Sequence, residues 1–369
     1  MNPVRVRAVT ACVLIAGAAL AAGSPAACGS RADKKAIWGP VRVNGASAFS
    51  VYHDLGVGIF QMGLNWAAVA PNRPRRARDP RDPAYRWPAD IDYAIAQAAR
   101  YRMRILLQVS RTPAWANRGR PDNYPPRDVD RLAAFVIAAA RRYPSVHLWM
   151  ILGEPNRRGN FGSLVSARAD ASRLTRRQAA APHRYARMLD ASYAALKRVS
   201  RRNLVIGGNT FTGGDIAPRL WIENIRLPNG RPPRMDLYGH NPFSWREPNL
   251  ANPADDPRNA KASWAIDFSD VGRLGKLVNR NLARRDKRIR LFLSEWMIPT
   301  GPDSELGFHT TRAVQARWIT AGWRIVRRSR FIYALGWIHL FDDPPGGSMS
   351  GLLDAQGRPK PGYFAFKAG

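Results

Sequence analysis

Cysteine is nearly absent from this chain, and its scarcity limits what the folded part can contain. The two cysteines, Cys12 and Cys28, both lie close to the N-terminus. The remaining residues therefore form no internal disulfide and no thiolate metal site. We expect a domain that is stabilised by a large apolar core, which a chain of 369 residues can bury without such cross-links.

Several motifs that carry chemistry in other folds are missing as well. No G-x-G-x-x-G turn follows the first predicted strand, which argues against a dinucleotide-binding fold, and no G-x-S-x-G elbow indicates a serine nucleophile. Asp342 and Asp343 suggest a metal site, but no His-x-His pair or Asp/His cluster accompanies them. The sequence thus predicts neither a cofactor nor a metal.

Acidic residues are scarce, with 27 against 58 basic ones, so the formal net charge is +31. The basic residues are mostly arginines and are scattered along the chain. The pattern is typical of a solvated basic surface, and the alternative is attraction to an anionic polymer such as an acidic polysaccharide. No zinc-finger, homeodomain or RNA-binding motif accompanies the charge, so no specific nucleic-acid partner is predicted.

The N-terminus combines Arg5 and Arg7 with an uncharged run over 8–27 that is rich in alanine, valine, leucine and isoleucine. A basic start followed by a short apolar core and small residues indicates an export signal. The run is also long enough for a retained membrane anchor. Cys28, which is followed by Gly29, resembles the lipid-modified cysteine of bacterial lipoproteins.

We therefore divide the chain into 1–30, a signal peptide or a lipoprotein or membrane anchor, and 31–369, one folded domain. The predicted location is secreted or extracytoplasmic. Contact with a membrane is expected only through this N-terminal segment or through a lipid on Cys28.

Strand-like and helix-like segments then alternate along the folded domain. The predicted strands cover 36–41, 57–66, 103–110, 148–152, 204–209, 235–243, 289–297 and 332–341. The predicted helices cover 47–55, 89–101, 128–143, 182–199, 216–225, 271–283 and 311–327, with a last helix near the C-terminus. Repeated β-then-α units in one domain predict an α/β fold, a single-domain (β/α)8 TIM barrel with decorated βα loops.

Two of the predicted strands end in a glutamate. The apolar run 148–152 leads to Glu154, and Pro155 cannot continue a strand. The run 291–294 leads to Glu295 in the same way. Barrels of this kind keep their chemistry at the carboxyl ends of their strands, so the two carboxylates are expected to face each other across one pocket.

Paired carboxylates suit the hydrolysis of glycosidic bonds. One carboxylic acid protonates the departing oxygen, and the other carboxylate meets the oxocarbenium-like carbon. A carboxylate separation of about 5–5.5 Å defines a retaining enzyme, which forms a glycosyl-enzyme intermediate. This chemistry alone leaves open which glutamate takes which role.

Residues around both glutamates form a wider pattern. It comprises Gly153-Glu154-Pro155-Asn156, Ser294-Glu295-Trp296, His240-Asn241-Pro242-Phe243 on the sixth strand and Gly336-Trp337-Ile338-His339 on the eighth. The order and spacing of these motifs resemble those of clan A glycoside hydrolases, the superfamily of (β/α)8 retaining enzymes that includes families 5 and 39. The resemblance extends from about Ile37 to the C-terminus.

The resemblance implies a retaining glycosidase that acts on a β-linked glycoside or polysaccharide and needs no cofactor. The basic charge of the chain adds an anionic polysaccharide to the candidate substrates. It assigns Glu154 as the acid/base and Glu295 as the nucleophile. It also implies that the sugar subsite is shaped by His240, Phe243, Trp296 and Trp337.

Two positions depart from the pattern of that superfamily. The asparagine that usually precedes the acid/base and binds a sugar hydroxyl is replaced by Gly153, and an arginine that supports the nucleophile is replaced by Gln61. Three explanations are open. Another side chain substitutes for the missing amide, with Asn65, Gln108 and Asn209 as the candidates, or the substrate is unusual at that position, or the activity is weak.

These departures keep two other functions open. One is a carbohydrate-binding protein without hydrolytic activity on the same barrel. Gly153 in place of the usual asparagine and Gln61 in place of the usual arginine favour it. The other is an adhesin that binds an anionic polymer through the basic surface. Retention of both glutamates favours the enzyme.

Overall fold

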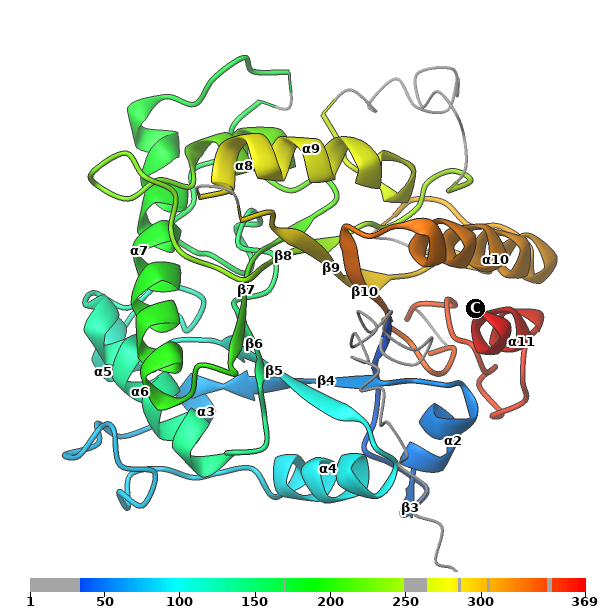
Figure 1. The fold of residues 1–369 in the computed structure, drawn as a ribbon, viewed down its shortest axis with the longest axis horizontal. Helices are drawn as coiled ribbons and strands as arrows, with labels where there is room; N and C mark the ends of the chain where they lie inside the picture. The colour runs from blue at the N-terminus through cyan, green and yellow to red at the C-terminus, as the bar shows by residue number, and fades with distance from the viewer. Residues whose placement is uncertain (1–33, 169, 249–263, 285–286, 304–305, 344–346) are drawn as a thin grey trace, which may run out of the picture.

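The computed structural model describes residues 34–168, 170–248, 264–284, 287–303, 306–343 and 347–369. At its centre is a closed barrel of parallel strands, and helices surround it (Figure 1). The barrel strands are β1 (Lys35–Trp38), β4 (Ile59–Asn65), β5 (Arg104–Ser110), β6 (Leu148–Ile151), β7 (Leu204–Phe211), β8 (Leu237–Asn241), β9 (Arg290–Trp296) and β10 (Ile332–Trp337). The ring closes because β1 pairs with both β4 and β10.

A longer helix follows each barrel strand in these ranges. These helices are α2 (Phe49–Asp54), α4 (Ala89–Arg100), α6 (Val129–Arg142), α7 (Arg176–Val199), α8 (Pro218–Asn224), α9 (Val271–Leu282), α10 (Arg312–Arg328) and α11 (Pro361–Ala368). Shorter elements decorate the loops: the β2 (Arg42–Val43) and β3 (Ala46–Ser47) ribbon, α3 (Trp66–Val69), α5 (Ala114–Asn117) and η3 (Phe268–Asp270). The predicted (β/α)8 barrel with decorated loops is confirmed.

Two apolar layers follow from the alternation of side chains along the strands. Side chains at every second strand position point into the barrel, and those between them point toward the helices. The inner layer consists of Ala36, Ile59, Leu106, Leu148, Met150, Ile206, Leu237, Phe292 and Ala334. A larger cluster fills the space between the strands and the helices. Each fully buried leucine or phenylalanine in these layers stabilises the fold by about 1.5–3 kcal/mol.

Capping residues set the beginnings of two long helices. The Asp128 carboxylate accepts a hydrogen bond from the backbone N–H of Asp130 at 2.9 Å, so α6 begins where the sequence predicted. Helix α7 begins at Arg176, earlier than the predicted start at Pro182. Thr175 and Gln178 form a reciprocal capping box there, and Pro182 is accommodated inside the helix.

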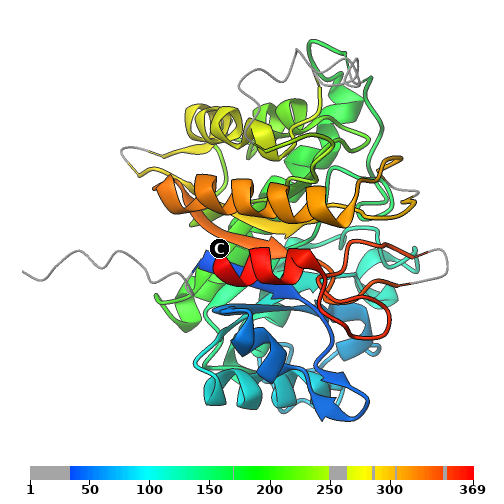
Figure 2. The ribbon, with the colours of Figure 1, turned by 90° about the vertical axis from the view of Figure 1, so that its right-hand side faces the viewer.

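The N-terminal end of the barrel is tied to the C-terminal helix. The buried ammonium of Lys35 donates to the carbonyls of Leu55 at 3.1 Å, Phe366 at 2.8 Å and Lys367 at 2.8 Å. Figure 2 shows α11, in red, alongside α10, in orange, and next to the blue N-terminal elements. One cation thus joins β1, the end of α2 and the end of α11.

No helix within the described ranges is both long and apolar enough to span a bilayer. The predicted N-terminal signal or anchor segment, with Cys12 and Cys28, lies outside the residues that the structure describes.

Candidate active site

A polar cavity of about 260 Å³ lies at the carboxyl ends of β5, β6 and β9. The residues that line it are Gln108, Ser110, Arg111, Leu152, Gly153, Glu154, Asn160 and Glu295. The structure therefore brings Glu154 and Glu295 to one cavity, on the face of the barrel where (β/α)8 enzymes carry their catalytic residues.

The backbone around Glu154 is strained. Leu152 has a φ of 63° and Glu154 a φ of 47°, a left-handed conformation that costs a non-glycine residue about 1–2 kcal/mol. The backbone N–H of Glu154 donates to the carbonyl of Asn209 at 2.9 Å, which attaches this segment to β7. Strain held by surrounding contacts is typical of functional positions.

Asn156 adds a second attachment between the same two segments. Its fully buried amide donates to the carbonyls of Phe211, Gly213 and Ile216 at 3.1–3.3 Å and accepts from the backbone N–H of Phe211 at 2.8 Å. The asparagine of the Glu-Pro-Asn motif therefore holds the loop after β7 against the segment that carries Glu154.

Three side chains hold the carboxylate of Glu154, whose residue is only 7% exposed. Asn241 donates to Oε1 at 2.9 Å, while Arg157 at 2.9 Å and Asn160 at 3.2 Å donate to Oε2. The Arg157 guanidinium also lies 4.4 Å from the ring centroid of Phe211, a cation–π contact that limits its freedom. Glu154 is thus oriented by one charged and two neutral donors.

Glu295 reaches the cavity because β9 carries one extra residue. Leu293 pairs with Leu335 and Trp296 pairs with Trp337, so three steps along β9 match two along β10. Such an irregularity re-aims the side chains beside it. Ser294 turns inward, where its carbonyl accepts from Gln61 at 2.9 Å and its hydroxyl donates to Gln61 at 3.0 Å.

Gln61 contacts the residue that precedes Glu295 on β9. It is buried, and both ends of its amide contact Ser294, the neighbour of Glu295. A side chain at Gly336 would collide with this arrangement, since its Cβ would lie 2.1 Å from the Ser294 carbonyl oxygen and 2.5 Å from Nε2 of Gln61.

The three candidates for the missing amide lie in different places. Asn65 caps α3 by accepting from the backbone N–H of Ala68 at 3.0 Å and is not among the residues that line the cavity. Asn209 is the extra residue of β7 relative to β8, has a φ of 40° and is fully buried. Gln108 lines the cavity directly beside Gly153.

The His240 side chain points away from Glu154 and into the layer between strands and helices. Its Nδ1 contacts the Thr210 hydroxyl at 2.8 Å, and its Nε2 lies 2.9 Å from the Ile266 carbonyl oxygen. Burial lowers the pKa of His240 to about 4, although both hydrogen bonds oppose that shift. The imidazole is therefore neutral at pH 7, with Nε2 as the donor to Ile266. The next residue, Asn241, is the one that touches the acid/base candidate.

The aromatic residues predicted for the sugar subsite are packed among other apolar side chains. The ring centroid of Phe243 lies 5.3 Å from that of Phe211, and both rings belong to a small apolar cluster. Trp296 and Trp337 are fully buried, pack edge to face at 5.4 Å and belong to the layer between strands and helices. The structure does not bring these two tryptophans to the cavity, because the extra residue in β9 turns Trp296 outward.

Some contributors to the site were not predicted from the sequence. They are Asn241, Arg157, Asn160, Ser110 and Arg111. Asn241 had a usable signal, since strict alternation along its strand places it on the face opposite to His240. Ser110 had the same kind of signal, since alternation places it on the same face of its strand as Leu106 and Gln108. Arg111, Arg157 and Asn160 lie in loops, where no periodic pattern indicates the direction of a side chain.

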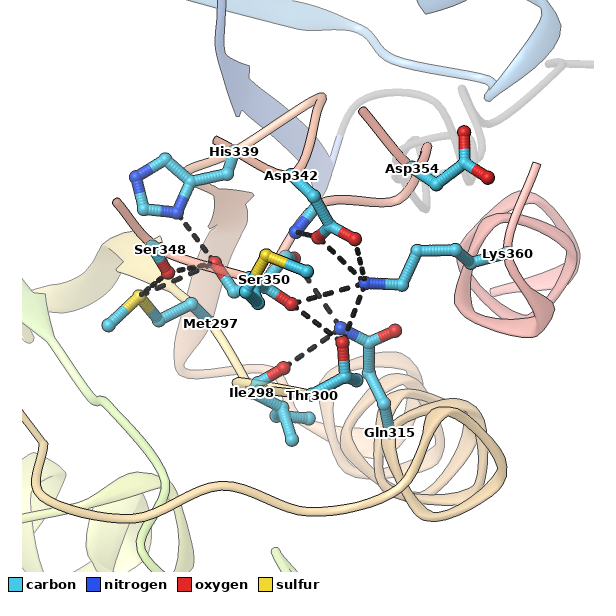
Figure 3. Close-up of polar contacts among 12 residues, drawn as sticks. Met297, Ile298, Thr300, Gln315, His339, Asp342, Ser348, Ser350, Asp354 and Lys360 are labelled. Carbon is cyan, nitrogen blue, oxygen red and sulfur yellow. Dashed lines mark hydrogen bonds and ion pairs between the residues drawn. The ribbon is translucent and has the colours of Figure 1, made fainter. Parts of the chain in front are cut away.

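A buried ion pair supports the loop that leads from β10 to α11, next to the end of β9. Figure 3 shows Lys360 extending to Asp342, with N···O distances of 2.8 and 3.1 Å, and to the Thr300 hydroxyl at 2.9 Å. Asp342 also accepts from the backbone N–H of Gly351 at 2.8 Å. Both charged side chains are fully buried. Asp342 therefore has a structural partner.

Within the described ranges, no group of three or more histidine, cysteine, aspartate or glutamate side chains is placed to hold a metal ion. The polar side-chain groups that line the cavity are two carboxylates, two amides, one serine hydroxyl and one guanidinium.

The chain was compared with protein-family models, curated protein sequences and solved structures. No protein-family model matches the chain, and no curated protein sequence matches it. Among solved structures, a family 39 glycoside hydrolase from Bacteroides cellulosilyticus superposes with a TM-score of 0.65 and 16% identity, covering 91% of this chain and 62% of that protein. This chain thus spans less than two thirds of that enzyme's length.

Two further structures give the same result. A monomeric β-xylosidase from Caulobacter crescentus has a TM-score of 0.61 at 16% identity, with 91% of this chain and 67% of that protein covered. A family 5 glycoside hydrolase from Streptomyces cattleya, solved with a Man-β1,4-GlcNAc disaccharide, has a TM-score of 0.58 at 15% identity, with 91% and 79% covered. The chain therefore has the barrel fold that these family 39 and family 5 glycoside hydrolases share.

Proposed function

We propose that this protein is a retaining glycoside hydrolase that acts on a β-linked glycoside or polysaccharide. The observation that carries the proposal is the shared cavity of Glu154 and Glu295 at the carboxyl ends of β6 and β9. Paired carboxylates on this face of a barrel suit acid-assisted departure of an alcohol and nucleophilic attack on the anomeric carbon.

In the proposed reaction, Glu154 gives its proton to the departing oxygen while Glu295 attacks the anomeric carbon, and a glycosyl-enzyme forms. Glu154 is then a carboxylate, which Arg157, Asn160 and Asn241 stabilise by charge and hydrogen bonds. In the second step, Glu154 takes a proton from water, which attacks the anomeric carbon and releases Glu295.

The substrate is a carbohydrate, and the surroundings of the cavity are compatible with an anionic one. Arg111 lines the cavity, and Arg157 lies beside it in contact with Glu154. Guanidinium groups bind carboxylates strongly. We also propose that the protein acts outside the cytoplasm, on the basis of the signal-like segment at 1–30, and that any membrane contact involves that segment or a lipid on Cys28.

The first test uses a panel of activated aryl β-glycosides, including uronides, together with envelope polysaccharides. Glu295→Gln is expected to lower kcat by at least 1000-fold, since the nucleophile is lost. Glu154→Gln is expected to keep more activity than Glu295→Gln on substrates with good leaving groups, which depart without acid assistance. Azide attacks the glycosyl-enzyme without help from a base, so added azide should restore turnover of Glu154→Gln and give a β-glycosyl azide as the product. Glu223→Gln, a surface change in α8, serves as the matched control.

Unchanged turnover in Glu295→Gln would contradict the nucleophile assignment. An inverted first product, read by NMR, would contradict the retaining mechanism. Binding without turnover on the whole panel would support a non-hydrolytic carbohydrate-binding protein. Binding of anionic polymer that is abolished by salt and unaffected by Glu295→Gln would support an adhesin.

A further inference from the structure

The amide of Gln108 occupies the space that a side chain at position 153 would need. A Cβ placed on Gly153 would lie 2.7 Å from Nε2, 2.9 Å from Oε1 and 3.0 Å from Cδ of Gln108. Gly153 is not among the residues with a left-handed φ, so its backbone does not require glycine. The absence of a side chain at 153 and the presence of Gln108 are therefore spatially linked.

Strand alternation explains how Gln108 reaches this place. On β5, Leu106 belongs to the inner apolar layer, and Gln108 and Ser110 follow on the same face toward the carboxyl end. Gln108 pairs in register with Gly63 on one side and Met150 on the other. Its amide thus leaves the apolar layer and lines the cavity that Glu154 and Glu295 share.

The amide of Gln108 has hydrogen-bonding capacity to spare. Among the described residues its one hydrogen-bond partner is the Met150 sulfur, at 3.3 Å from Nε2. A thioether is a weak acceptor, whereas a glutamine amide offers two donors and a carbonyl acceptor. A polar group of a substrate that enters the cavity can therefore replace the contact with Met150 at little cost.

We propose that Gln108 binds the sugar hydroxyl on C2, the carbon next to the anomeric carbon, in place of a side chain at position 153. This inference rests on the proposed glycosidase function. Gly153 directly precedes Glu154, so the amide lies beside the residue that protonates the departing oxygen. Besides the departing oxygen, the substrate has two oxygens close to the anomeric carbon: the ring oxygen and the hydroxyl on C2. The ring oxygen only accepts, while the C2 hydroxyl both donates and accepts and so matches both ends of an amide. Hydrogen bonds to this hydroxyl strengthen in the transition state.

The test compares Gln108→Met, which keeps volume and removes the amide, with wild type on an aryl glycoside and on its 2-deoxy analogue. The expected loss of kcat/KM is about 100-fold on the parent glycoside, typical of one transition-state donor. The loss on the 2-deoxy analogue should be much smaller, because that substrate has no hydroxyl to bind. In a swap, Gln108→Ala with Gly153→Asn should recover activity relative to Gln108→Ala alone, since an amide then enters the same space from the loop after β6.

Gln97→Ala, a glutamine truncation in α4, is the matched control and should leave both substrates unaffected. Thermal unfolding of each variant separates a folding defect from a lost contact. Equal losses on the parent and 2-deoxy substrates, or no loss on either, would overturn the assignment of Gln108. If wild type itself turns over no substrate, the proposed function has failed instead, and the two failures are therefore distinguishable.

Discussion

The fully buried imidazole of His240 makes the stability of the folded protein depend on pH. Burial lowers its pKa to about 4 in the folded state, whereas an unfolded histidine titrates near 6.5. Between these values the unfolded chain binds more protons than the folded one, so stability falls as the pH falls. We predict a loss of about 3 kcal/mol from this residue as the pH falls from about 6.5 to about 4.

The measurement for His240 is urea unfolding across that pH range for wild type and His240→Gln. Glutamine can still donate to the Ile266 carbonyl but does not titrate, so the variant should lose less stability on acidification. Protonation of carboxylates changes the unfolding free energy of both proteins equally, so it cancels in the difference between them. Parallel pH profiles for the two proteins would contradict the prediction.

Among the elements, the connection from β10 to α11 depends on the buried pair of Lys360 and Asp342. Burial lowers the pKa of Lys360, and the carboxylate of Asp342 opposes that shift. Lys360→Met leaves a buried carboxylate without its cation, which typically costs 3–5 kcal/mol. We therefore expect a loss of about that size in the free energy of unfolding, measured by chemical denaturation.

Removing the charge from the partner should reverse part of that loss. In the double variant Lys360→Met with Asp342→Asn, the amide still accepts from the backbone N–H of Gly351 and carries no charge to desolvate. The double variant is expected to be more stable than Lys360→Met alone. Losses that simply add would show that the two side chains do not act as a pair.

For the whole molecule, the two ends of the barrel have separate tasks. Lys35 lies at the start of β1, at the opposite end of the strands from the cavity, and donates to two buried carbonyls and one partly buried carbonyl. Lys35→Met removes this donor from all three carbonyls. The Phe366 carbonyl keeps the backbone N–H of Gly369, whereas each carbonyl that stays buried without another partner costs about 1–3 kcal/mol. We predict a marked drop in the unfolding free energy with kcat/KM unchanged at a temperature where the variant is folded.

Lys367→Met is the matched control for this prediction. Lys367 pairs with Asp54 at the same end of the barrel, but both side chains are about half exposed. An exposed ion pair contributes about 0–1 kcal/mol, so this variant should resemble wild type in denaturant. A fall in kcat/KM for folded Lys35→Met would show that the N-terminal end is coupled to the site.

The alternation of strands and helices was predictable because short-range patterns of apolar residues determine it. Apolar runs of strand length and helix-period segments recur along the chain, and these periods do not depend on distant residues. The same local logic places Glu154 and Glu295 at strand ends, and a closed barrel brings such ends to one face. The start of α7 was the main exception, because the capping box at Thr175 outweighs the expected effect of Pro182.

What surrounds the two glutamates was decided only by the tertiary structure. One extra residue in β9 turns Trp296 outward, and one in β7 places Asn209 beneath Glu154. The position of Gln108 beside Gly153 joins β5 to the loop after β6, more than 40 residues away in the chain, and no local period encodes such a contact. The sequence by itself determined the barrel and its pair of carboxylates, because backbone periodicity is local. The hydrogen-bond partners of those carboxylates depend on register and close packing between distant strands, which only the folded chain sets.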